Sequence, residues 1–295
     1  MRTKEKLYQL FMNVIMAFLA LMCILPFVLL FSSSLTSQAA IINHGYQFFP
    51  TDFSFEAYRY IFNDAQSIIR AYGVTVTVTV IGTVASLIMT TLVAYPLSRK
   101  DLPHRNFFSL YIFFTMLFNG GLVPLYLVYT RLFEFKNTLW ALIVPLALVN
   151  AFYVIITRTY FQTTIPNEVI ESGKIDGAGE FKIFYRIVLP LSLPILATIG
   201  LFQTIHFWND WFNGLIFLTD SKLYSIQNML NRILLDAQFL SSMDFGSAQG
   251  DLQSSIPTMT IRLAIAVIGV VPILLIYPFF QGFFVKGLTV GAVKG

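Results

Sequence analysis

Six stretches of this sequence are long and apolar enough to cross the hydrocarbon core of a membrane. A core of about 30 Å requires about 20 helical residues. The stretches lie near residues 8–31, 74–97, 107–130, 139–158, 194–218 and 259–281. Because 56% of the 295 residues are hydrophobic and only 12% are charged, the chain has too little polar surface to cover a globule in water. The sequence therefore predicts an all-α polytopic membrane protein with six transmembrane helices.

The second and third stretches carry signals that compete with a plain helix. Val74–Val80 reads VTVTVTV, and a period of two is typical of a strand. A lone strand would leave backbone groups unpaired in lipid, so we expect a helix. Gly120, Gly121 and Pro124 interrupt the third stretch, where we expect a kink or an unwound turn that faces protein and not lipid.

The N-terminus and the single cysteine narrow the class further. Basic residues before the first apolar run imitate a secretory signal peptide, but the run from Leu7 to Phe31 is about twice as long as a signal core. We therefore expect an uncleaved first span. Cys23 is the only cysteine, which excludes a disulfide framework and a cysteine-based metal site. The net charge of +4 is small for the length and gives no reason to expect a nucleic-acid partner.

The distribution of lysine and arginine predicts the orientation, because these residues favour cytoplasmic loops. Eight of them lie in segments 1–7, 98–106 and 282–295. They are Arg2, Lys4, Lys6, Arg99, Lys100, Arg105, Lys286 and Lys294. The short loop 131–138, on the opposite side, holds only Arg131 and Lys136.

We therefore expect both termini, the tail 282–295 and the loop 159–193 to lie in the cytoplasm. The longer loops 32–73 and 219–258 then face outward. They either dock an external partner or only cover the outer mouth of the protein.

The segment Ile165–Pro194 is the longest charged, helix-capable part of the chain. Pro166 suits the first turn of a helix, and Glu168 places negative charge at the positive end of the helix dipole. The helix can run to Ile175. Asp176-Gly177 is a reasonable stop, because glycine tolerates the left-handed conformation.

A second helix is expected from Ala178 to Val188, ended by Pro190 before the fifth span begins. On the first helix, Ser172 and Gly173 are small enough to allow close approach of a partner backbone, and Glu171 offers a carboxylate to an arginine. The alternative is an amphipathic helix that lies on the membrane surface.

This segment resembles the cytoplasmic signature, known as EAA, of the permease subunits of ABC-type importers. The matching residues are Glu171, Asp176, Gly177, Ala178, Ile187, Leu189, Pro190 and Pro194. Gly173 departs from the pattern, which usually has alanine, and glycine should loosen the helix by about 0.5–1 kcal/mol. The resemblance implies that the helix 166–176 is a coupling helix seated in a groove of a cytoplasmic ATPase. Its coupling residues would be Glu168, Glu171, Ser172, Gly173, Asp176, Gly177 and Ala178.

Other matches extend the resemblance over almost the whole chain. Residues 94–99 (AYPLSR) look like a motif of MalG-like carbohydrate permeases. Residues 118–126 (FNGGLVPLY) and the end from Tyr277 to Gly295 are similar to the LplC and YtcP subgroup, which is linked to complex oligosaccharides. The resemblance implies a type I ABC importer permease fold in a single domain, 1–295, in the plasma membrane of a Gram-positive bacterium.

The resemblance also implies partners. These are a second, unlike permease, a cytoplasmic ATPase dimer, an extracellular solute-binding lipoprotein and the oligosaccharide, in addition to membrane lipid. The chain agrees, because it contains no G-x-x-x-x-G-K-[ST] phosphate-binding loop. We therefore expect neither catalytic residues nor a cofactor on this chain, with ATP and Mg²⁺ bound by the ATPase.

The fifth stretch contains four polar residues, Gln203, His206, Asp210 and Asn213. At about 100° per residue of an unbroken helix they fall within an arc of about 80°. An acid is costly in lipid, so Asp210 should face a cavity or a partner helix. Sugars are bound by polar groups and aromatic faces, and both are present. We predict a substrate pathway at Gln203, His206, Trp208, Asn209, Asp210, Trp211 and Asn213.

Trp208-Asn209 also resembles the WN-acid cluster of carbohydrate permeases. One alternative is that these polar groups only form hydrogen bonds with the second permease. The four-residue spacing of His206 and Asp210 would also suit a proton relay or a pair of metal ligands.

Two other classes of protein compete with the importer subunit. A secondary transporter would need coupling-ion sites within its spans, where only Asp210 is a clear acid. Its usual internal repeat is not visible either. An intramembrane enzyme would need a motif such as HExxH or paired intramembrane aspartates, and the sequence contains neither.

Overall fold

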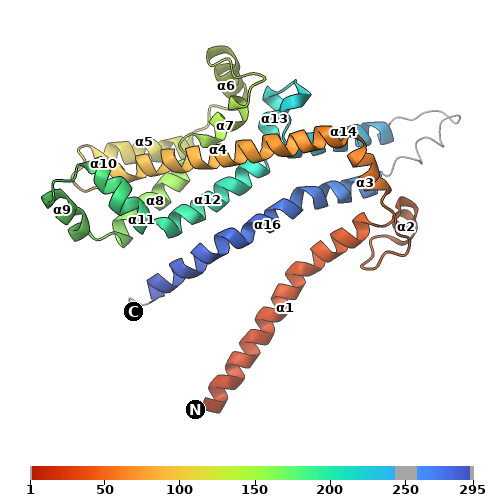
Figure 1. Ribbon diagram of the computed structural model, residues 1–295, viewed down its shortest axis with the longest axis horizontal. Coiled ribbons are helices and arrows are strands. Elements are labelled where there is room, and N and C mark those ends of the chain that lie inside the picture. The colour runs from red at the N-terminus through yellow and green to blue at the C-terminus, as the bar shows by residue number, and fades with distance from the viewer. Residues whose placement is uncertain (1, 243–257, 293–295) are drawn as a thin grey trace. The chain divides into compact units, whose positions relative to one another are not determined.

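The computed structural model describes residues 2–242 and 258–292 (Figure 1). Its described residues form helices and no strand, with one isolated bridge between Thr36 and Phe53. The chain divides into two compact units. Unit 1 is Met1–Ile68 with Leu230–Pro272, and unit 2 is Ile69–Met229 with Ile273–Gly295. The predicted all-α class is confirmed.

Three described helices are long and apolar enough to cross a membrane alone. They are Tyr8–Ser34, Ala65–Ser98 and Met259–Ile276. Three helix pairs pass the same test together although each is bent: Arg105–Leu117 with Leu122–Leu132 (108°), Trp140–Ala147 with Ala151–Thr164 (50°), and Glu180–Leu191 with Leu193–Trp208 (80°). The described helices thus provide up to six spans, as predicted.

Unit 1 contains the first helices of the chain. They are α1 (Arg2–Ser34), α2 (Gln38–His44), α3 (Glu56–Ile61) and the 3₁₀ turn η1 (Phe62–Asp64). The apolar window of α1 is 0% buried within the described chain, so lipid or a partner subunit must cover it. At the end of α1, the Ser34 and Tyr58 hydroxyls form a 2.8 Å hydrogen bond.

The loops predicted for 32–73 and 219–258 are largely helical. The first contains α2, α3 and the beginning of α4 (Ala65–Ser98). The second contains the 3₁₀ turn η4 (Ser221–Leu223) and α14 (Ile226–Ser242), and residues 243–257 lie outside the described residues. Residues 282–292 of the predicted tail belong to α16, which runs without a break from Thr258 to Ala292, and 293–295 lie outside the described residues.

The VTVTVTV stretch is helical, as expected, and lies within α4. The Thr75 hydroxyl donates to the carbonyl of Ala71, and that of Thr77 donates to Gly73, each over 2.8 Å. These bonds to the preceding turn satisfy the hydroxyls inside the helix. The alternation of valine and threonine therefore does not mark a strand, and both residue types occur on both faces of the helix: Thr75 and Val78 are buried, whereas Val76 and Thr77 are exposed.

One face of α4 carries buried hydroxyl residues, and this face packs on α12 (Leu193–Trp208). The residues are Thr75, Thr79, Thr83, Ser86 and Thr90. The Thr83 and Thr204 hydroxyls lie 3.4 Å apart, and a Cβ added at Gly82 would collide with the Phe207 ring. Small residues let membrane helices approach closely in this way.

The third span is bent where the sequence predicted it. α5 (Arg105–Leu117) ends before the glycine pair, and Gly121 has φ +89°. α6 (Leu122–Leu127) follows and continues into the π-helical turn η2 (Val128–Leu132). Phe118 is 63% exposed and Val123 is 67% exposed. Within the described chain the turn is thus uncovered, and the expected protein cover would have to come from another subunit.

The fourth span is two helices, α7 (Trp140–Ala147) and α8 (Ala151–Thr164), and not the continuous helix 139–158 of the prediction. Asn150 causes the break. Its side-chain oxygen accepts from the backbone N–H groups of Phe152 and Tyr153, so it starts a new helix as an N-cap. α8 then extends past the predicted boundary.

A buried apolar cluster lies at the end of unit 2 where Figure 1 shows α9 (Asn167–Ile175) and α10 (Glu180–Ile183). α6 and α13 (Phe212–Phe217) lie away from this end of the unit (Figure 1). The cluster joins α9 and α10 to α4, α8 and α12. Its buried members are Ala94, Tyr95, Leu97, Val154, Phe161, Ile165, Ile170, Ile183, Phe184, Val188, Ile195 and Ile199.

Candidate functional site

The first candidate site is the predicted coupling helix, α9. It begins after Pro166, carries Glu168 in its first turn and Lys174 in its last. These charges complement the helix dipole. Glu168, Glu171 and Ser172 are exposed, whereas Ile170 is buried in the cluster beneath. The helix thus has one face attached to its own chain and one face open to a partner.

The end of α9 is a glycine turn, as predicted. Gly177 has φ +76°. Its N–H donates to the carbonyl of Lys174, and the N–H of Ala178 donates to that of Gly173. This pair of bonds is the Schellman arrangement, which requires a residue that tolerates positive φ. Asp176 is the exposed C-cap residue, and Ala178 is half-buried.

Gly173 does not lie on the exposed face where the sequence placed it beside Ser172. It is buried, and a Cβ there would lie 3.1 Å from Ile187 Cδ1 and 3.4 Å from Ile183 Cγ1. The close approach that a small residue allows is therefore made by the chain's own next helix. Adjacent residues of a helix point about 100° apart, so Gly173 can face the interior although Ser172 is exposed.

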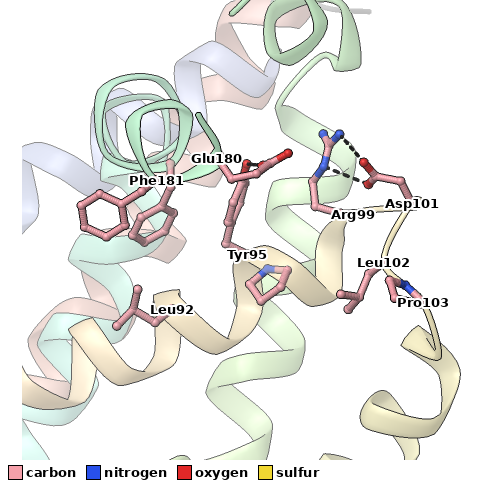
Figure 2. Close-up of a pocket in the computed structure, with 10 residues that line it drawn as sticks. Leu92, Tyr95, Arg99, Asp101, Leu102, Pro103, Glu180 and Phe181 are labelled. Carbon is pink, nitrogen blue, oxygen red and sulfur yellow. Dashed lines mark hydrogen bonds and ion pairs between the residues drawn. The ribbon is translucent and has the colours of Figure 1, made fainter. Parts of the chain in front are cut away.

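A polar network joins α9 and α10 to the end of α4. Lys174 Nζ lies 2.7 Å from Glu180 Oε1 and 3.3 Å from Asp101 Oδ2. The Tyr95 hydroxyl donates to Glu180 Oε2 over 2.6 Å. Arg99 Nε lies 3.3 Å from Asp101 Oδ1. Figure 2 shows the Tyr95–Glu180 and Arg99–Asp101 contacts, which lie beside a cavity of about 470 Å³.

The network remains charged throughout the neutral range. Hydrogen bonds from Lys174 and then Tyr95 lower the pKa of Glu180. Burial acts to raise the pKa of Asp101, but hydrogen bonds from its own backbone, Arg99 and Lys174 outweigh this and lower it. Hydrogen bonds to Glu180 and Asp101 raise the pKa of Lys174. Both carboxylates are therefore ionised and the lysine is protonated at neutral pH.

Sequence reasoning did not select Tyr95, Asp101, Lys174 or Glu180 as site residues. Tyr95 and Glu180 are 85 positions apart, so no local pattern links them. The one available signal was the placement of opposite charges at Lys174 and Glu180 on either side of the glycine turn.

The segment after α10 differs from the prediction that Pro190 ends a helix. The chain widens into the π-helical turn η3 (Phe184–Val188) and continues as α11 (Leu189–Leu191). A π turn accommodates a proline that cannot donate to the preceding turn. The 80° bend comes at Ser192, whose hydroxyl donates to the carbonyl of Val188 over 2.7 Å.

The second candidate site is the polar stripe predicted for the fifth span. The prediction of a polar stripe required one continuous helix through 194–218. In the structure, α12 ends at Trp208 and α13 begins at Phe212. Extrapolating about 100° per residue past a helix end has no meaning. The prediction that Gln203, His206, Asp210 and Asn213 share one face is therefore wrong.

Four predicted pathway residues do meet around one cavity of about 440 Å³. They are His206, Asn209, Asp210 and Trp211. The cavity is completed by Tyr153, Phe202, Ile205 and Phe212, which the sequence did not single out. The Tyr153 and Phe202 rings stack with centroids 6.5 Å apart and an interplanar angle of 13°. The cavity thus combines aromatic faces with hydrogen-bonding groups.

Asp210 lines this cavity and is held by Asn213. Its Oδ1 accepts from the Asn213 backbone N–H (3.2 Å) and its Oδ2 from Asn213 Nδ2 (3.0 Å). The Asp210 carbonyl accepts from the Ser225 hydroxyl over 3.1 Å. The expectation that Asp210 faces a cavity is met, and Asn213 serves as its buried support.

Gln203 and Trp208 do not line this cavity. Gln203 is 1% exposed, and its Oε1 has no hydrogen-bond partner among the described residues. Trp208 is 3% exposed and packs on Tyr72, with ring centroids 6.2 Å apart. Their predicted contact with a substrate is therefore not supported by the cavity's lining.

The chain matches the family model of "Binding-protein-dependent transport system inner membrane component" over residues 101–290. It is 40% identical over 292 residues to the Polygalacturonan/rhamnogalacturonan transport system permease protein YtcP of Bacillus subtilis, covering 99% of this chain and 100% of that protein. It is 39% identical to Protein LplC of the same organism, covering 92% and 90%. A solved bacterial ABC transporter chain "involved in the import of the acidic polysaccharide alginate" superimposes with TM-score 0.76 and 28% identity, covering 95% and 98%.

Proposed function

The chain belongs to the family of inner membrane components of binding-protein-dependent transport systems and is a multi-pass permease subunit of a sugar ABC importer; on this premise we propose that it carries oligosaccharides of the polygalacturonan and rhamnogalacturonan type. The observation that carries the proposal is the 40% identity to a permease named for those polysaccharides, which extends over the full length of both chains. The similarity to an alginate importer chain supports an acidic sugar polymer as the source.

The family works with a partner permease, an ATPase and a binding protein. For this chain we propose an unlike second permease, a cytoplasmic ATPase dimer that holds ATP and Mg²⁺, and an extracellular lipoprotein that delivers the oligosaccharide. The lack of a phosphate-binding loop in the sequence supports a separate ATPase. The Bacillus relatives support the plasma membrane of a Gram-positive cell, and the lysine and arginine distribution supports cytoplasmic termini.

We propose that the exposed face of α9 docks on the ATPase. Glu168 and Glu171 give this face negative charge, which suits a basic groove. Glu171→Lys should leave the complex assembled but abolish the stimulation of ATP hydrolysis by the sugar-loaded binding protein. Glu134→Lys, which makes the same change in the 131–138 loop, is the matched control. Normal stimulation in the Glu171→Lys complex would contradict the docking.

We propose that the sugar contacts His206, Asn209, Asp210 and Trp211 on its way through the membrane. Aromatic faces pack against sugar rings while amide, imidazole and carboxylate groups pair with hydroxyls. The cavity that gathers these groups supports this path.

The proposed function is tested by uptake into vesicles that contain the assembled complex. In these vesicles the ATPase and ATP are on the inside, and the binding protein is on the outside. Labelled rhamnogalacturonan and polygalacturonan oligosaccharides should then enter. Arabino-oligosaccharides serve as the comparison. Uptake of arabino-oligosaccharides alone would contradict the proposed substrate class and assign the chain to arabino-oligosaccharides. Uptake driven by an ion gradient without ATP would instead support a secondary transporter.

A further inference from the structure

Glu180 is bound by two different elements through its two carboxylate oxygens. Oε1 pairs with Lys174, in the last turn of α9, over 2.7 Å. Oε2 accepts the Tyr95 hydroxyl, near the end of α4, over 2.6 Å. Tyr95 is 8% exposed, and its ring lies 5.1 Å from that of Phe184, centroid to centroid. A single side chain therefore connects Lys174, beside the glycine turn, to the second membrane span. Figure 2 shows its contact with Tyr95.

Asp101 completes a closed set of contacts, in which Lys174 pairs with Glu180 and Asp101, and Glu180 accepts from Tyr95. We call this set of four side chains the ring. Lys174 also reaches Asp101, which follows α4 in the chain and pairs with Arg99. α9 is thus tied to the end of α4 at two points. By contrast, the covalent path from α9 to α12 passes through a π turn and the 80° bend at Ser192. Interrupted hydrogen bonding makes such a path easier to bend than a packed contact.

The ring adds little to the stability of the fold. The side chains of Lys174, Glu180 and Asp101 are 38%, 55% and 58% exposed, and ion pairs in such positions are weak. The apolar cluster under α9 already holds the helix in place. The ring instead fixes the position of α9 relative to the end of α4.

We propose that Glu180 is a positioning residue that passes the displacement of α9 on to α4 through Lys174 and Tyr95. The proposal rests on the proposed docking of α9 on an ATPase. When the ATPase moves α9, the ring moves the end of α4, and α4 carries the motion along its close contact with α12. Coupling between ATP hydrolysis and sugar movement then depends on side chains that do not touch the sugar.

The test compares sugar uptake with ATP hydrolysis in the same vesicles, using labelled rhamnogalacturonan oligosaccharide and the loaded binding protein. The variants are Tyr95→Phe, Glu180→Gln and Lys174→Met. Each should lower the amount of sugar taken up per ATP hydrolysed by about fivefold or more, while basal ATP hydrolysis without the binding protein stays at the wild-type level. The uptake ratio of the Tyr95→Phe/Glu180→Gln double variant should be no lower than that of the poorer single variant, because both substitutions break the same set of contacts.

Matched controls separate this role from a structural one. Lys174→Arg keeps the ion pair and should restore the wild-type ratio. Tyr160→Phe removes a hydroxyl from the same apolar cluster, and Lys182→Met removes a charge from α10. Neither residue forms a side-chain hydrogen bond or ion pair within the described chain, so both ratios should stay at the wild-type value. A wild-type ratio in Tyr95→Phe or Glu180→Gln overturns the proposal. Failure of the wild-type complex to take up the sugar would instead refute the proposed substrate.

Discussion

Asp210 lies just beyond the last residue of α12, and this position decides what its carboxylate can contact. Both oxygens accept from Asn213, which fixes the side chain, while the residue still lines the cavity with Trp211. Each carboxylate oxygen has a further lone pair that can accept a sugar hydroxyl. A fixed acceptor next to an aromatic ring is a suitable contact for a moving sugar.

Asp210→Ala should therefore lower the rate of sugar uptake in assembled complexes by about tenfold, which corresponds to the loss of about 1.4 kcal/mol of interaction. Asp210→Asn keeps an acceptor and should retain more of the activity. Asp236→Ala, at an exposed aspartate of α14, is the control. Equal uptake rates for the Asp210→Ala and control complexes would show that the sugar does not contact this group.

Gly177 is a second residue whose backbone decides its role. A side chain at its φ of +76° is strained although nothing lies within 4 Å of the added Cβ. Gly177→Ala should lower the free energy of unfolding by about 1–2 kcal/mol. Gly179→Ala is the matched control, because Gly179 has φ −69° and is equally uncrowded. Thermal unfolding of both variants in detergent checks the difference, and equal midpoints would contradict it.

At the scale of elements, short segments are held together by single polar side chains. Asn137, in the loop before α7, has φ +57°. Its Oδ1 accepts from the backbone N–H groups of Thr219 (2.6 Å) and Asp220 (3.2 Å), and its Nδ2 donates to the Thr219 hydroxyl (2.8 Å). Two segments about 80 residues apart in the chain are thereby joined beside the end of α13.

Asn137→Ala should reduce the free energy of unfolding by about 1–3 kcal/mol, because it removes these hydrogen bonds and because alanine tolerates a positive φ less well than asparagine. Asn137→Gly removes the same bonds without the strain, so it should be less destabilising. The measurement is the unfolding midpoint of the purified chain in detergent. A larger loss in the glycine variant would mean that the strain argument is wrong.

At the scale of the whole molecule, much apolar surface is left for lipid and partner subunits. The membrane-crossing window of α1 is entirely unburied, and the bend between α5 and α6 is exposed. An unpaired backbone in lipid is costly. The bend is therefore expected to be covered by the second permease in the complete importer.

The predicted orientation can be checked with single cysteines in a Cys23→Ser background. Ser221→Cys should react with a membrane-impermeant maleimide on intact cells, because the loop before α14 is expected outside. Lys182→Cys, on α10, should react only after the membrane is opened. The reverse pattern would place α9 outside the cell and exclude its contact with an ATPase.

The sequence by itself determined the helical class, the number of apolar spans and the glycine turn at Gly177. These depend on local physics: the length of an apolar run and the backbone freedom of one residue. The tertiary structure decided which polar groups meet. It placed Gly173 against its own chain, separated Gln203 and Trp208 from the cavity of Asp210, and brought Tyr95 to Glu180. Such contacts depend on where helices end and how they pack against one another. The residue pattern within a single span does not contain this information.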